Sequence, residues 1–182
     1  TADKKNETLV GSVISSSFPY SQITPTEDPM KNFTPDLHIA AGEMKLNSYS
    51  HLPIKTYAEF EDVDPLSGVL GFLGRQSEDA VMLVQILITP ANFAWQAQAV
   101  EMAGKQVYDE KADKYTMDPQ KLLMMQKASF QGGKAGIRLM VGVKDGDPLP
   151  SLQNLAGTFG AFSLGDGNQF VFKKPLFRKK HL

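Results

Sequence analysis

The chain of 182 residues contains no cysteine and only one tryptophan. The absence of cysteine excludes disulfide bonds, thiolate catalysis and cysteine-ligated metal sites, and it leaves the redox compartment open. An excess of one charge is also lacking, because 19 Lys and Arg residues are matched by 20 Asp and Glu residues. A net charge of -1 gives no sign of a chain built mainly to coat nucleic acid. The fold therefore has to hold by packing alone.

Long apolar runs are missing as well. No run approaches the roughly 20 residues that a membrane-spanning helix needs. The start Thr1-Ala2-Asp3-Lys4-Lys5 has neither an initiator methionine nor a signal peptide, which predicts a piece cut from a longer protein. The apolar content of 42% is enough for one domain. We expect a single domain over residues 1–175, with a Pro-rich loop at 24–35 and a basic tail or linker towards a following domain at 176–182.

The spacing of apolar residues predicts a mixture of helices and strands. Asp64-Pro65 is a typical helix start, and the segment 80–89 lacks polar alternation, which favours a central strand. Expected helices cover residues 6–17 with Asn6 as N-cap, 66–73, 92–108, the segment after Asp118-Pro119, and 152–159; expected strands cover 36–47, a brief edge segment at 54–57, 80–89, 137–143 and 169–172. This order predicts an α+β domain, a two-layer sandwich with helices packed on a mainly antiparallel sheet, with a ferredoxin-like version preferred.

A search for reactive motifs finds none that is complete. Gly132-Gly133-Lys134-Ala135-Gly136 lacks the spacing and the hydroxyl residue of a phosphate-binding loop, which indicates a flexible turn. The three histidines, His38, His51 and His181, are far apart in sequence and are expected at the surface. The acidic residues at 59–64 are typical of a helix N-terminus. We therefore expect no catalytic, cofactor-binding or metal-binding residues.

Two features could bind a partner. Trp95 follows the predicted central strand, where it would either pack in the core or serve as a stacking platform. The C-terminal basic run would be a solvated tail or would contact anionic lipid or nucleic acid. The candidate interaction residues are Trp95, Lys173, Lys174, Arg178, Lys179 and Lys180.

Several segments together resemble a known family. These are L-P-I-K-T-Y-A-E-F-E at 52–61, D-P-L at 64–66, V-Q-I-L-I-T-P at 84–90 with Trp95 five residues on, and F-P-Y-S-Q-I at 18–23. This combination is similar to a domain of large membrane-associated proteins of the type IV secretion and conjugative-transfer class. The resemblance implies an N-terminal membrane anchor, this α+β domain, and then a hexameric nucleotide-driven translocase of DNA or protein.

The resemblance predicts a non-catalytic accessory domain of such a translocase ATPase, on the cytoplasmic face of a membrane. The domain would mediate subunit assembly or position the substrate or the membrane. Expected partners are further copies through the parent protein, and DNA or anionic lipid at the basic tail, with no small-molecule substrate. The alternative is a free-standing ligand- or peptide-binding module in which Trp95 and the Pro-rich loop line a cleft.

Overall fold

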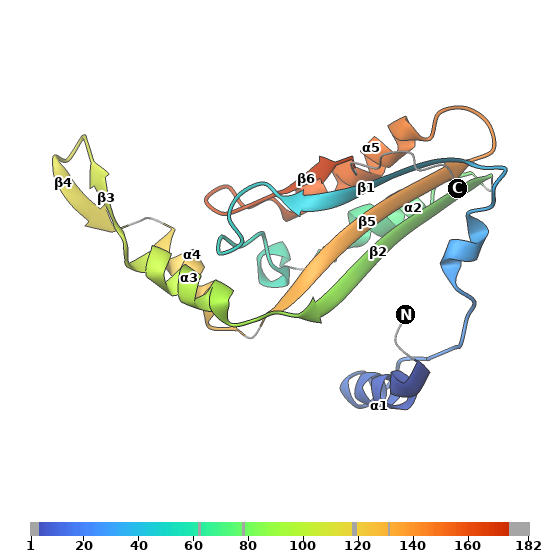
Figure 1. Cartoon of the computed structure of the whole chain (residues 1–182), viewed down its shortest axis with the longest axis horizontal. Coiled ribbons are helices and arrows are strands. Elements are labelled where there is room, and N and C mark those ends of the chain that lie inside the picture. The colour runs from blue at the N-terminus through green and yellow to red at the C-terminus, as the bar shows by residue number, and fades with distance from the viewer. Residues whose placement is uncertain (1–3, 62, 78, 118–119, 131, 175–182) are drawn as a thin grey trace. The chain divides into compact units, whose positions relative to one another are not determined.

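A computed structural model describes residues 4–61, 63–77, 79–117, 120–130 and 132–174 (Figure 1). The chain divides into two compact units, residues 1–34 and residues 35–182, and each is described here by itself. The predicted single domain over residues 1–175 stays a prediction. Arg178, Lys179 and Lys180, the rest of the predicted basic tail and the predicted helix start Asp118-Pro119 lie outside the described residues.

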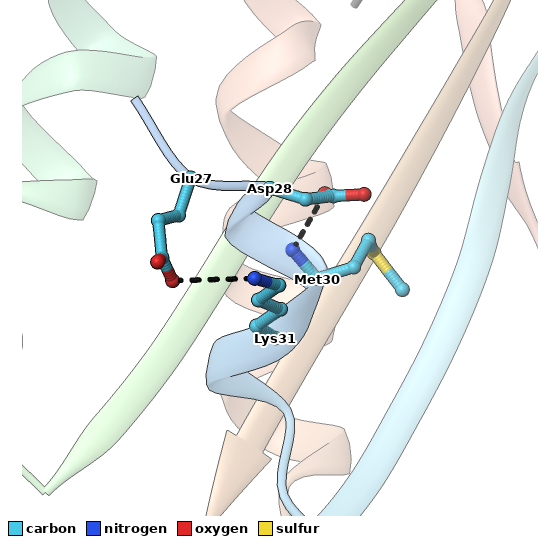
Figure 2. Close-up of polar contacts among 4 residues, drawn as sticks. All are labelled: Glu27, Asp28, Met30 and Lys31. Atoms are coloured by element: carbon cyan, nitrogen blue, oxygen red, sulfur yellow. Dashed lines mark hydrogen bonds and ion pairs between the residues drawn. The ribbon is translucent and has the colours of Figure 1, made fainter. Parts of the chain in front are cut away.

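The described part of the first unit contains one α-helix and two short turns of 3₁₀ helix, η1 (Lys4–Asn6) and η2 (Pro29–Asn32). Helix α1, Glu7–Ser17, confirms the predicted helix, but Asn6 ends a preceding 3₁₀ turn and its side chain caps nothing. The Pro-rich loop forms η2, Pro29–Asn32, where the Asp28 carboxylate accepts a hydrogen bond from the Met30 amide at 3.0 Å. Lys31 and Glu27 form an ion pair at 3.5 Å across the same turn (Figure 2). Local capping explains why this loop is not wholly irregular.

The second unit is built on a four-stranded antiparallel sheet, and the α+β class is confirmed. Its strands are β1 (His38–Leu46), β2 (Ala80–Pro90), β5 (Gly133–Val143) and β6 (Phe170–Lys173), in the spatial order β2-β5-β1-β6. Helix α2 (Ser67–Leu73) connects β1 to β2, and α5 (Leu149–Gly157) connects β5 to β6. The helices form the second layer. The ferredoxin-like version stays a prediction, because a long insertion separates β2 from β5 where that arrangement has a hairpin.

The core lies between one face of the sheet and the helices. Leu139 and Val141 of β5 are fully buried and alternate with Arg138 and Met140 on the other face, as the predicted alternation requires. They pack against Leu152, Leu155, Val69 and Phe159 from the helical layer. Gly42 of β1 has no side chain because the Phe172 ring of β6 fills that space. Burial of these apolar side chains holds the two layers together.

Four predicted features differ from the structure. The segment 80–89 is a strand but lies at the edge of the sheet, not at its centre. Residues 54–57 form no strand; they lead into the 3₁₀ turn η3, Tyr57–Phe60, which Thr56 and Glu59 close with a capping box. The helix predicted to reach residue 108 ends at Gly104. The spacing of Leu66, Val69, Leu70 and Leu73 predicts one buried stripe on α2; Val69 is buried, but Leu66 and Leu70 are exposed.

The insertion between β2 and β5, residues 91–132, is called the arm. It contains α3 (Ala94–Gly104), β3 (Gln106–Asp109), β4 (Lys114–Met117) and α4 (Lys121–Ala128). The two helices pack on each other, and β3 and β4 pair as a hairpin that lies beyond them in Figure 1. Tyr108 and Tyr115 meet edge to face across this hairpin at 5.3 Å. Asp113, at φ 53°, occupies the left-handed position of its turn and accepts a hydrogen bond from the Tyr108 hydroxyl.

The segment after β1, residues 47–56, attaches the arm to the sheet. Leu52 is buried against Ala103 of α3 and Met124 of α4. The Lys127 ammonium group of α4 donates to the Ser50 carbonyl at 2.5 Å and to the Leu52 carbonyl at 3.1 Å. Burial lowers the pKa of Lys127. The arm is therefore held by one apolar cluster and one partly buried cation.

Candidate interaction surface

β2 has a free edge in the described part of residues 35–182, because β5 pairs with only one side of its backbone. The Ala91 amide donates to the Gly132 carbonyl at 3.3 Å, in continuous register with the β2–β5 pairs. Hydrogen-bonded and non-hydrogen-bonded pairs alternate in antiparallel sheets. The odd-numbered residues of β2 therefore bond to β5. The backbone groups of Met82, Val84, Ile86 and Ile88 point outward, and we call them the β2 edge.

The side chains of β2 carry no charge over 11 residues, and the strand contains no glycine. Its last residue is Pro90, whose position is even-numbered, so the missing N–H costs no bond to β5. Pairing between β1 and β5 stops at Met44 and Ile137, so the far part of the β2–β5 pair continues as a two-stranded ribbon. Ile88 on this ribbon is 74% exposed. An apolar, uncharged edge of this length is a template for another strand.

The arm also exposes large apolar side chains. Leu122 of α4 is 80% exposed, and Phe130, just after α4, is 65% exposed. Phe93 at the start of α3 is exposed as well. The Gln96 side chain donates to the Phe130 carbonyl at 2.8 Å and to the Ala128 carbonyl at 3.1 Å, which fixes the end of α4 against the start of α3. Exposed apolar groups on a fixed scaffold are typical of protein interaction sites.

Trp95 lies in the first turn of α3 and is partly buried. Its indole packs on Gly132, where an added Cβ would stand 2.7 Å from the ring. Of the two alternatives for Trp95, packing is the role that this contact supports. The structure therefore assigns it to the joint between the arm and β5, and gives it no stacking partner among the described residues.

The basic candidates lie elsewhere in the sheet. Lys173 ends β6 opposite Glu43 of β1, and Lys174 follows it. Glu43 also forms ion pairs with Lys45 and, at 4.0 Å, with Arg138. The hydrogen bond and charge of Lys45, and then the charge of Arg138, hold the pKa of Glu43 below its usual value. The open face of the sheet thus carries a small basic cluster around one carboxylate. Two strands separate β6 from β2, so the structure does not bring Trp95 together with Lys173 or Lys174.

The described residues show little that could do chemistry. They contain no group of three or more His, Asp or Glu residues placed to hold a metal ion. Two open depressions of about 300 and 540 Å³ lie against the sheet, and Trp95 lines neither. The expected surface position is wrong for His51, which is 3% exposed and stacked on Tyr49 at 5.3 Å. The ligand-binding alternative stays a prediction.

Sequence reasoning missed the β2 edge and the apolar arm. For the arm, a signal was present: Tyr108 and Tyr115 flank the polar turn D-E-K-A-D-K, which is a hairpin pattern. For the edge, the lack of polar alternation over 80–89 predicts a strand, but one-sided backbone pairing leaves no trace in side-chain periodicity.

A comparison with protein-family models matches residues 1–145 to the family described as "Domain of unknown function (DUF8128)", and the chain belongs to this family. The match includes β1, β2, the arm and β5, and it ends before α5 and β6. No curated protein and no solved structure matches the chain. No helix in the described part of the chain combines the length and the apolar character needed to cross a bilayer.

Proposed function

We propose that this member of the DUF8128 family is a non-catalytic accessory domain of a type IV secretion or conjugation-type translocase ATPase. In that role it brings subunits of a membrane-anchored parent protein together on the cytoplasmic face of the membrane. The proposal combines the resemblance of segments 18–23, 52–61, 64–66 and 84–90 with the kind of surface that the fold exposes.

The observation that carries the proposal is the exposed apolar surface of the arm and the adjoining ribbon. Leu122, Phe130, Phe93 and Ile88 are large apolar side chains that the described part of the chain leaves open to solvent. A stable interface buries about 1,600 Å² in total, and each Å² of apolar surface contributes about 25 cal/mol before the cost of association is subtracted. An arm that carries such residues at its base and along α4 is suited to binding another protein.

The basic residues have a second role in this proposal. Lys173 and Lys174, with Arg178, Lys179 and Lys180 in the tail, orient the domain towards an anionic partner, either lipid headgroups or DNA. Interactions of exposed charges are screened by salt and change the rate and geometry of binding more than its strength. The apolar arm therefore supplies the affinity, and the basic residues supply the orientation.

The test is subunit assembly of the full parent protein, measured by light scattering after size-exclusion chromatography. Leu122→Asp combined with Phe130→Asp removes apolar surface at two exposed positions and should weaken assembly by about tenfold or more. Tyr57→Asp is the matched control, because Tyr57 is equally exposed but lies outside the arm. Unchanged assembly of the arm variant would overturn the proposal, as would turnover of ATP by the isolated chain. A parent gene that lacks upstream membrane-spanning segments and also lacks a downstream G-x-x-x-x-G-K-[ST] motif would overturn the proposal as well.

A further inference from the structure

The two edge strands of the sheet, β6 and β2, differ in length and in composition. β6 is four residues long, ends in Lys173 and is followed in the sequence by Lys174-Pro175. Short length, lysine and proline are the usual protections of an edge strand against pairing with another chain. β2 at the other edge is 11 residues long and has none of these within its length before Pro90. One edge is therefore protected and the other is left open.

We propose that the β2 edge is the site where a second copy of this chain adds its own β2, antiparallel, to form one continuous eight-stranded sheet. This inference rests on the proposed function in that it names the partner for subunit assembly. A second copy fits because an uncharged strand meets no like charge when it pairs with itself.

Backbone parity and full overlap of the two strands together select one register. Full overlap of two copies of Ala80–Pro90 places Gln85 opposite Gln85 of the second copy, on the two-fold axis. In that register even-numbered residues face even-numbered residues. Both copies then direct the outward backbone groups of the β2 edge at each other, and a slip by one residue would lose this match.

The side chains agree with the same register. Met82 faces Ile88 of the second copy, and Val84 faces Ile86. On the other face of the sheet Leu83 stands opposite Leu87. Every one of these cross-strand pairs is apolar, and the Gln85 amides at the axis can hydrogen-bond to each other. The exposed Ile88 would be covered by the second copy.

A cysteine scan tests the register directly, because the chain has no cysteine of its own. Gln85 would form a non-hydrogen-bonded pair with itself, with its Cα atoms about 4.5 Å apart, which suits a disulfide. Gln85→Cys should therefore form a cross-linked dimer under mild oxidation with copper phenanthroline. Thr89→Cys is the matched control: its two copies would lie about 27 Å apart. It should cross-link only when mixed with Val81→Cys, its expected neighbour.

Sedimentation of the full chain provides the second measurement. The unmodified chain should show a concentration-dependent dimer. Ile88→Lys should raise the dimer Kd by about tenfold. The variant loses the apolar pair of Ile88 with Met82, which the two-fold symmetry places in the dimer twice. Tyr57→Lys adds the same charge at an exposed position outside both the arm and β2 and should leave this Kd unchanged. A monomer at all concentrations, a dimer without the Gln85→Cys cross-link, or an unchanged Kd for Ile88→Lys would each overturn the inference.

The failure of this inference can be told apart from the failure of the proposed function. If the isolated chain is a monomer but the arm variant weakens assembly of the parent protein, the β2 pairing is wrong and the accessory role stands. If the chain dimerises through Gln85 but the arm variant leaves the parent's assembly unchanged, the β2 pairing stands and the arm-based role is wrong.

Discussion

Asn168 is a buried polar residue that holds the segment to which the arm is attached. Its side chain is 3% exposed, and its oxygen accepts hydrogen bonds from the Ser48 and Gln169 amides, both at 3.0 Å. Its amide nitrogen donates to the Tyr49 carbonyl at 2.9 Å. These contacts join the turn before β6 to residues 47–56, and that segment carries Leu52 into the arm. Asn168→Ala should therefore destabilise the second unit and loosen the arm.

The expected loss follows from two non-local hydrogen bonds. Truncation leaves the Ser48 amide and the Tyr49 carbonyl without their side-chain partner, and each lost bond to these partly buried groups costs about 1–2 kcal/mol. The bond to Gln169 is local and contributes less. We expect a total loss of about 2–4 kcal/mol in the free energy of unfolding. Asn168→Asp keeps the acceptor but places a carboxylate oxygen against the Tyr49 carbonyl, where the amide nitrogen donated, so it should lose at least as much stability as Asn168→Ala.

Urea denaturation followed by circular dichroism measures this loss, with the m-value as a check on the unfolding transition. Asn154→Ala, at an exposed position of α5, is the control and should change stability by no more than about 0.5 kcal/mol. Hydrogen exchange adds a local readout, because the Ser48 amide should lose protection in Asn168→Ala. A loss below about 1 kcal/mol at an unchanged m-value, with Ser48 still protected, would refute this reasoning.

Three further predictions concern packing and charge. Gly42→Ala should cost about 1–3 kcal/mol of stability, measured by urea denaturation, because the added methyl group overlaps an aromatic ring of β6. Gly132→Ala should shift the fluorescence of Trp95, the only tryptophan, since the new Cβ would stand 2.7 Å from the indole; an unchanged spectrum would contradict this contact. Glu43 has a lowered pKa, so its contribution to stability is present above about pH 4.5 and is lost as the pH falls through its folded pKa; NMR titration should show that pKa rising in Lys45→Gln.

The sequence predicted elements well wherever side-chain alternation reports burial. Residues 137–143 alternate because one face of β5 packs on the helices and the other stays open, and the strand lies where it was expected. The D-P signal lies just before α2, where the Asp64 carboxylate accepts from the Leu66 amide at 2.9 Å; the helix itself begins at Ser67 with Leu66 as its N-cap. Local chemistry of this kind is encoded by neighbouring residues and needs no knowledge of the rest of the fold.

Other features depend on contacts that are distant in sequence. The end of α3 at Gly104 is followed by β3, whose stability comes from pairing with β4 and not from its own four residues. Leu66 and Leu70 have the spacing of a buried stripe, but α2 is only seven residues long and buries Val69 alone. His51 is buried because residues 47–56 fold under the arm, which its own sequence surroundings do not indicate.

The position of β2 is the most informative difference. An uncharged apolar run predicts a strand with neighbours on both sides, whereas this strand has a neighbour on one side only among the described residues. The inferred dimer would remove this difference, because β2 of each copy would then be a central strand of an eight-stranded sheet. β2 would then have a paired strand on each side, which explains why its side-chain pattern is that of a central strand. On this inference, β2 is long and contains no lysine, unlike β6, because the β2 edge is kept free to bind, and its one proline is its last residue, Pro90.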